Sequence, residues 1–174
     1  IGAGRNRSGI GEYIGKYFHK NSADVVSVLG RTEETSRKAS SNLQKYGIKS
    51  NSYADLHEMV ERERPDVIVI ASPSSTHYDY LVKCVDLGLN IFCEKPFLSP
   101  DLDDIKGRVE NILGKAKEKR LTLSMNSQWP FALKYYEKIC GEIGIKKSNR
   151  FFISLSPFTS GREMISEAVP HALS

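Results

Sequence analysis

The chain has 174 residues, of which 40% are hydrophobic, 26% charged and 9% aromatic, as is typical of a soluble globular protein. The formal net charge is only +4, and acidic residues are interleaved with basic ones at 61–64 and 115–120, which is typical of solvated helix faces. Because the basic excess is small and interleaved with acids, we do not expect a nucleic acid as a partner. Because no apolar run approaches the roughly 18 residues of a membrane span, we do not expect a membrane either.

The first residues, Ile1-Gly2-Ala3-Gly4, are typical of the end of a strand that continues into a glycine turn. We therefore expect the chain to be a piece of a longer polypeptide. The three cysteines, Cys84, Cys93 and Cys140, lie far apart in apolar surroundings. Their odd number and isolation favour buried free thiols over a disulfide framework or a metal site. We therefore expect a reducing, cytoplasmic location and no bound metal.

Strand-like and helix-like segments alternate from the strand end at Ile1-Gly2 to about residue 125. Apolar, β-branched runs predict strands at 24–29, 48–53, 66–71, 90–93, 121–125 and 150–155. Amphipathic stretches bounded by capping residues, glycine or proline predict helices at 11–18, 32–46, 55–64, 75–87, 100–119 and 130–140. Apolar strands joined by helices predict an α/β fold, a Rossmann-type doubly wound parallel sheet.

In such a sheet, ligands bind at the carboxyl ends of the strands. The loop from Gly2 to Gly11 lies between a strand end and a helix, where glycines let the backbone approach a phosphate. Arg7 occupies the third position of the G-x-G-x-x-G pattern, so Gly9 or Gly11 must take that glycine's role; the alternative is a flexible surface turn. The candidate cofactor-binding residues of this loop are Gly2, Gly4, Arg5, Ser8, Gly9 and Ile10.

The second predicted strand ends at Gly30-Arg31-Thr32, where folds specific for NAD usually place Asp or Glu. An arginine can pair with a phosphate, and Thr32 adds a hydroxyl donor. These residues favour the 2′-phosphate of NADP, with NAD as the other possibility. The alternative is that Arg31 is simply an exposed residue at the start of a helix.

Two further strand ends carry polar residues. Ser72, Pro73 and Ser74 are small enough to let a cofactor lie close, and they are candidate cofactor-binding residues. His77 is a further candidate, although a histidine at this place is more often structural than catalytic. Glu94-Lys95-Pro96 follows the next strand, and Glu94 and Lys95 are also candidate cofactor-binding residues. A lysine there can bind a substrate hydroxyl and assist proton transfer, whereas the alternative is a surface salt bridge.

These motifs together resemble the Gfo/Idh/MocA family of NAD(P)-dependent oxidoreductases. The stretch from Tyr53 to Pro96 carries the resemblance, above all in Ala71-Ser72-Pro73, His77 and Glu94-Lys95-Pro96. The resemblance implies a dinucleotide-binding Rossmann domain at 1–126. It also implies that 127–174 begins an α+β substrate domain with a mostly antiparallel sheet, through which a homo-oligomer is expected to form.

The resemblance also implies a reaction, hydride transfer between nicotinamide and a hydroxyl-bearing carbon of a sugar, cyclitol or related compound. Lys95 matches the family's catalytic lysine. His171, four residues after Glu167, matches a D-x-x-x-H pattern with Glu in place of Asp, which implies an acid/base histidine and its partner. Gln128 and Trp129 fall where the family contacts nicotinamide or substrate, although Trp129 alternatively belongs to a domain-interface core.

Two other readings compete with this one. A short-chain dehydrogenase needs a Tyr-x-x-x-Lys pair, and none of the eight tyrosines has a lysine four residues later. A non-catalytic NAD(P)-binding regulator on the same fold is the alternative from another class. Such a protein would be expected to lack the catalytic lysine, so the presence of Lys95 favours an enzyme.

Overall fold

The computed structural model describes residues 1–4, 9–127, 134–135, 137–139 and 141. The chain separates into two compact units, Ile1–Met125 and Asn126–Ser174, and the fold described below is that of the first. The strand predicted at 150–155 lies outside the described residues. Of the helix predicted at 130–140, residues 134–135 and 137–139 are described and are helical.

Five short strands of the first unit pair in parallel, as the sequence predicts. They are β1 (Ser27–Leu29), β2 (Asn51–Tyr53), β3 (Val67–Ile70), β4 (Asn90–Cys93) and β5 (Leu123–Met125). β1 pairs with β2, whereas β4 lies between β3 and β5. The register sets apolar residues opposite each other, since Ile68 faces Ile91 and Ile91 faces Leu123.

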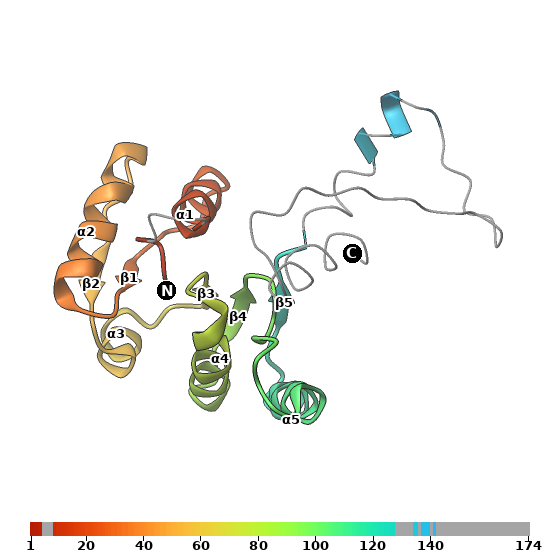
Figure 1. The fold of residues 1–174 in the computed structure, drawn as a ribbon. Helices are drawn as coiled ribbons and strands as arrows, with labels where there is room; N and C mark the ends of the chain where they lie inside the picture. The colour runs from red at the N-terminus through yellow and green to blue at the C-terminus, as the bar shows by residue number, and fades with distance from the viewer. Residues whose placement is uncertain (5–8, 128–133, 136, 140, 142–174) are drawn as a thin grey trace. The chain divides into compact units, whose positions relative to one another are not determined.

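The residues Ile1 and Gly2 join these two groups of strands into one layer. The Ile1 nitrogen donates to the Val69 carbonyl at 2.7 Å, and the Ala71 N–H donates back to the Ile1 carbonyl at 3.0 Å. On the other side, the Gly2 N–H donates to the Leu29 carbonyl at 3.4 Å. The strand order is therefore β2, β1, the Ile1–Gly2 segment, β3, β4 and β5, and Figure 1 shows the N-terminus between β1 and β3.

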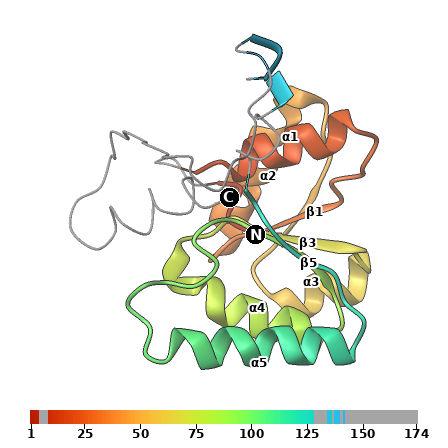
Figure 2. The ribbon, with the colours of Figure 1, turned by 90° about the vertical axis from the view of Figure 1, so that its right-hand side faces the viewer.

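Helices cover both faces of this layer. They are α1 (Gly11–Lys20), α2 (Glu33–Leu43), α3 (Leu56–Glu63), α4 (His77–Asp86) and α5 (Ile105–Glu118), with the short 3₁₀ turns η1 (Gln44–Tyr46) and η2 (Ser74–Thr76). In Figure 1, α1 and α2 lie on one side of the strands, and α3, α4 and α5 lie on the other. Figure 2 shows α5 running alongside α4 beneath the strands. This arrangement confirms the predicted Rossmann-type α/β architecture.

The starts of α2 and α3 follow from their capping residues. The Thr32 hydroxyl accepts from the N–H of Thr35 at 3.2 Å, and the Thr35 hydroxyl accepts from the N–H of Thr32 at 3.0 Å. The Asp55 carboxylate caps α3 by accepting from the N–H of Glu58 at 2.8 Å. These side chains satisfy backbone donors that a helix start otherwise leaves without partners.

Two helices begin later than predicted. The helix expected from Pro100 starts at Ile105, because Asp104 adopts a left-handed backbone with φ of 47° and caps the helix through the Gly107 N–H. A residue in that conformation cannot continue a right-handed helix from its preceding turn. The helix expected from Ser75 starts at His77, because residues 74–76 tighten into the 3₁₀ turn η2.

Alternating side chains of the strands divide the apolar core between the two faces. Val28 packs with Ala39, Leu43 and Ile48 on the side of α2. Its neighbour Leu29 belongs to the larger cluster on the side of α3, α4 and α5. This division is expected because successive strand residues point to opposite faces. Among the described residues, no helix is long and apolar enough to cross a membrane.

Two glycines test the packing of this layer. A Cβ added at Gly30 would lie 2.5 Å from the backbone nitrogen of Ser36, whereas a Cβ at Gly114 in α5 would meet nothing within 4 Å. Gly30→Ala should therefore lower the free energy of unfolding by about 1–3 kcal/mol, the usual cost of overpacking. Gly114→Ala should raise it by about 0.5–1 kcal/mol, because alanine favours a helix interior.

Urea unfolding followed by circular dichroism measures both changes. Equal effects of the two substitutions, or a neutral Gly30→Ala, would contradict the close approach of the β1 end to the start of α2.

Candidate cofactor and catalytic site

The ends of neighbouring strands are tied together along the carboxyl edge of the sheet. At each step, the N–H of the residue just after one strand, or of Gly2, donates to the carbonyl of the neighbouring segment. These bonds run from Gly30 to Tyr53 (3.0 Å), from Gly2 to Leu29 (3.4 Å), from Ala71 to Ile1 (3.0 Å) and from Glu94 to Ile70 (2.8 Å). The predicted site segments therefore begin at one common edge.

Gly2 is required where the first turn passes the end of β3. It has a φ of +83°, and an added Cβ would lie 2.5 Å from the backbone nitrogen of Ser72. A side chain at Gly2 would thus collide with backbone atoms, which cannot move as the end of a flexible side chain can. The absence of a side chain lets the turn at Gly2 and the loop at Ser72 lie in contact.

Gly11, one of the two candidates for the role of the third glycine, packs closely where α1 begins. It is the first residue of α1 and is buried, and an added Cβ would lie 3.0 Å from Ala3 Cα and 3.1 Å from Ala71 Cβ. The preceding residue, Ile10, has no side-chain oxygen that could cap the helix. The side chain of the N-cap residue of α1 therefore satisfies none of the backbone donors there, unlike the N-cap side chains of α2 and α3.

Arg31 stands exposed after β1, while its neighbours are engaged in starting α2. The Thr32 hydroxyl is part of the helix cap. The Glu33 carboxylate lies 3.2 Å from the Arg37 guanidinium, so one of the two acidic residues beside Arg31 is paired with another cation. Arg31 is thus an exposed cationic side chain just after the end of β1.

The loop after β3 is compact. Ser72 is buried, and its side-chain oxygen lies 2.8 Å from the Thr76 hydroxyl, which also lies 2.8 Å from the Pro73 carbonyl oxygen. These contacts close the loop on itself across η2. Ser72, Pro73 and Ser74 therefore lie on a fixed turn beside Gly2.

Lys95 follows β4 in a segment whose backbone is held on both sides. Its N–H donates to Glu94 Oε1 at 3.0 Å, and the peptide bond from Lys95 to Pro96 is cis. The carbonyl oxygen of Pro96 lies 2.8 Å from Nδ1 of His77. The lysine predicted to act on the substrate is thereby placed at the carboxyl end of the strand next to β3.

His77 lies inside the protein rather than on its surface. Its side chain is 1% exposed, and its Nε2 lies 2.9 Å from the Ser72 carbonyl oxygen. With Nδ1 at the Pro96 carbonyl, both ring nitrogens face backbone groups. These contacts are those of a structural histidine, and a contact of His77 with the cofactor stays a prediction.

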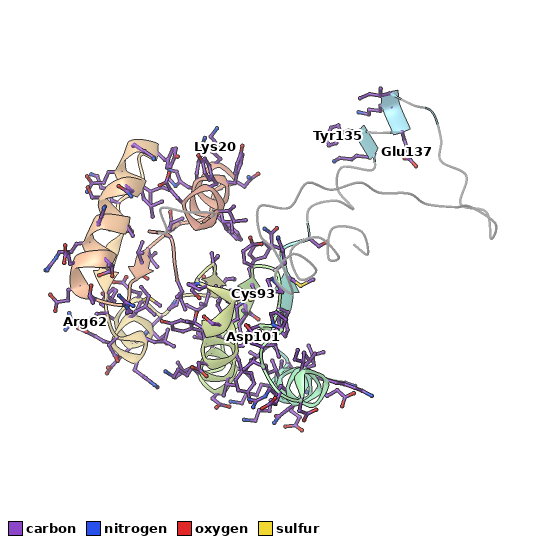
Figure 3. All side chains as sticks on the ribbon, viewed as in Figure 1. Lys20, Arg62, Cys93, Asp101, Tyr135 and Glu137 are labelled. Atoms are coloured by element: carbon purple, nitrogen blue, oxygen red, sulfur yellow. The ribbon has the colours of Figure 1, made fainter. Side chains whose placement is uncertain are left out.

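Cys93 lies behind this segment, at the end of β4 and within the sheet region of Figure 3. Burial raises the pKa of the Cys93 thiol to about 12 and that of Cys84 to about 11. Both are free and buried, as the sequence predicts, and they are protonated at neutral pH. Neither thiol is therefore suited to act as a nucleophile.

Several predicted site residues lie outside the described residues. They are Arg5, Ser8, Gln128, Trp129, Glu167 and His171. Their roles stay predictions. Within the described part of the chain, no cluster of three or more His, Cys, Asp or Glu residues could hold a metal ion.

Two hollows flank the sheet at opposite edges. One, of about 500 Å³, is lined by residues 22–28 and 63–69 at the amino ends of β1 and β3, and it reaches Ala3 and Gly11. The other, of about 700 Å³, lies where β2 ends and is lined by polar residues that include Glu33, Arg37 and Asp55. The second hollow borders the edge that carries Arg31.

Comparison with known proteins agrees with this geometry. Residues 1–127 match the Gfo/Idh/MocA oxidoreductase family with an NAD-binding Rossmann fold. An inositol 2-dehydrogenase of Salmonella typhimurium is 28% identical over 76 residues, which are 44% of this chain and 23% of that protein. A D-xylose 1-dehydrogenase (NADP(+)) of Hypocrea jecorina is 28% identical over 128 residues, 70% of this chain and 31% of that protein.

A solved structure, the UDP-N-acetylglucosamine 3-dehydrogenase GnnA from Acidithiobacillus ferrooxidans, superposes with a TM-score of 0.60 at 18% identity. The superposition covers 79% of this chain and 41% of that one, and at this identity it shows the fold. The chain thus matches less than half the length of these relatives. Since the family match spans the whole glycine turn, the Ser72 loop and Lys95, the chain belongs to the Gfo/Idh/MocA family of oxidoreductases.

Proposed function

We propose that the protein is an NAD(P)-dependent dehydrogenase or reductase that acts on a hydroxyl-bearing carbon of a sugar, a cyclitol or a related compound. One observation carries the proposal: the bonds along the carboxyl edge bring the turn at Gly2, the loop at Ser72 and the segment of Lys95 to adjacent strand ends. A dinucleotide needs the first two features, and proton handling needs the third.

The residues present fit a dinucleotide. The start of α1 follows the glycine turn, and its N-cap residue Ile10 has no side-chain acceptor, so the backbone donors there suit a pyrophosphate. Gly2 leaves room for the backbone to pass close to Ser72, which keeps the strand ends compact beneath a ligand. When bound, the nicotinamide would supply the hydride acceptor or donor.

Lys95 is the residue we propose to act on the substrate. Its ammonium can donate a hydrogen bond to the substrate hydroxyl and stabilise the negative charge that develops on that oxygen. We propose that His171 takes the hydroxyl proton and that Glu167 orients its ring. Gln128 and Trp129 would offer a hydrogen-bonding group and a flat apolar face to a polyhydroxylated substrate.

We further propose NADP as the favoured cofactor, with NAD also accepted. Support comes from the cationic Arg31 after β1, and from the pairing of Glu33 with Arg37, which reduces repulsion of a phosphate. A relative of similar sequence is named as an NADP(+) enzyme. We also propose that the protein forms a homo-oligomer through residues 127–174 and that it is located in the cytoplasm.

Lys95→Met tests the proposed role of the lysine. It should lower kcat by about 100-fold or more, the usual contribution of general acid–base catalysis, while the Kd for NADPH changes by less than about threefold. Steady-state turnover of a panel of sugars and cyclitols, with NADPH fluorescence titration, measures both quantities.

Lys83→Met is the matched control, because Lys83 is exposed on α4, and it should change neither quantity. Unchanged turnover in Lys95→Met would contradict the role of Lys95. Tight binding of NADPH without turnover of any substrate by the unaltered protein would instead favour the non-catalytic regulator.

Arg31→Ala tests the cofactor preference. It should weaken NADPH binding by about tenfold, because a charge-assisted contact with the 2′-phosphate is lost, and should leave NADH binding nearly unchanged. Lys38→Ala, which removes the same charge from an exposed position in α2, is the control for a general electrostatic effect. Equal weakening of NADPH and NADH binding in Arg31→Ala would refute the contact with the 2′-phosphate.

A further inference from the structure

We infer that His77 is a positioning residue with two separable tasks: its Nε2 fixes the cofactor-side loop at Ser72, and its Nδ1 fixes the segment that carries Lys95. The effect on turnover rests on the proposed function, whereas the link between the two segments does not. The ring lies between the segments that follow β3 and β4.

Both ring nitrogens lie at hydrogen-bonding distance from backbone carbonyl oxygens. Nδ1 is 2.8 Å from the oxygen of Pro96, and Nε2 is 2.9 Å from the oxygen of Ser72. A carbonyl oxygen can only accept, so each contact requires a hydrogen on the ring nitrogen. Both contacts are hydrogen bonds at the same time when each ring nitrogen carries a hydrogen, as in the imidazolium.

The surroundings keep the ring in this orientation. The side chain is 1% exposed, and the Cys93 sulfur lies 3.7 Å from Nδ1 on the side of β4. Because His77 is also the first residue of α4, its backbone is fixed by the helix that packs beneath β3 and β4. The ring therefore reaches both loops from a rigid base.

The His77 ring links the two loops that follow the paired part of β3 and β4. The backbone bond from the Glu94 N–H to the Ile70 carbonyl closes the pairing of β3 with β4. After it, one chain turns through Pro73 into η2 and the other passes through Pro96. The His77 ring contacts both segments, at Ser72 in the first and at Pro96, one residue after Lys95, in the second.

The position of Lys95 depends on this span. The Glu94 carboxylate holds the Lys95 N–H, and the His77 ring holds the carbonyl of the next residue. Reacting groups tolerate little displacement, since a shift of about 1 Å can lower a rate about 100-fold. Loss of the Pro96 contact should therefore affect chemistry, and loss of the Ser72 contact should affect the cofactor.

Two substitutions separate these contacts. In His77→Asn the amide nitrogen can take the place of Nδ1, which keeps a donor toward Pro96 and removes the one toward Ser72. In His77→Gln the amide nitrogen can take the place of Nε2, which keeps the donor toward Ser72 and removes the one toward Pro96. The pair thus differs in which loop stays held, although both residues are amides.

We expect opposite kinetic signatures. His77→Gln should lower kcat by about 10- to 100-fold and change the Kd for NADPH by less than about threefold. His77→Asn should raise that Kd by about tenfold and keep kcat, at saturating cofactor, within about threefold. Equal losses of both quantities in the two variants, or no loss in either, would overturn the separable roles.

Ile48→Val controls for stability, because it removes buried volume from the apolar cluster on the side of α2, to which His77 does not belong. It should lower the Tm and leave both kinetic quantities close to those of the unaltered protein. If Ile48→Val reproduces the signature of either His77 variant, the effects arise from general loosening, and the inference is wrong.

Amide hydrogen exchange without cofactor tests the link apart from activity. His77→Gln should speed exchange in a peptide that covers 94–98, and His77→Asn should speed it in one that covers 72–76. This outcome stands even if no substrate is turned over, so it separates failure of the link from failure of the proposed function. Uniform exchange changes across both peptides would contradict separate contacts.

If either variant does not fold, the unaltered protein still gives a decisive measurement. In ¹⁵N-histidine spectra, a His77 ring N–H that exchanges slowly with water is expected, because the ring is buried and donates to a carbonyl. A rapidly exchanging ring proton would overturn the inference.

Discussion

The row of backbone hydrogen bonds along the carboxyl edge is the constraint on which the site depends. It ties Tyr53, Leu29, Ile1 and Ile70 to the residues that begin the neighbouring loops, so loops far apart in sequence start at one line. Gly2 makes the row possible, because any side chain there would meet the backbone of Ser72. The positions of the glycine turn at Gly2, the Ser72 loop and Lys95 all follow from this arrangement.

Local signals in the sequence predict most of this fold. Thr32 and Asp55 cap helices as their residue types suggest, and the apolar run at 66–71 forms the strand that the Ile1 segment joins. The start of α5 could not be predicted, because the left-handed backbone of Asp104 is set by the turn before it. Pattern alone also could not show that Gly11 packs against Ala71, because the two residues are remote in sequence.

The candidate site was predictable where residue type and strand end coincide, as at Ser72 and Lys95. His77 shows the limit, because its motif position suggested a place near the cofactor while its ring is turned inward. Which atoms a histidine faces depends on two loops that are remote in sequence, and no periodicity encodes that. The buried ring and the uncharged thiol of Cys93 lie behind the site, so the polar chemistry falls to groups at the edge itself.

Amide hydrogen exchange with and without NADPH tests most directly whether this edge binds a dinucleotide. The account predicts slower exchange on binding in peptides that cover 2–11, 30–36, 71–77 and 94–96. It predicts no change at the opposite edge, in peptides that cover 24–27 and 64–67, or in the middle of α5. Protection centred on the amino ends of the strands, or no protection at saturating NADPH, would contradict it.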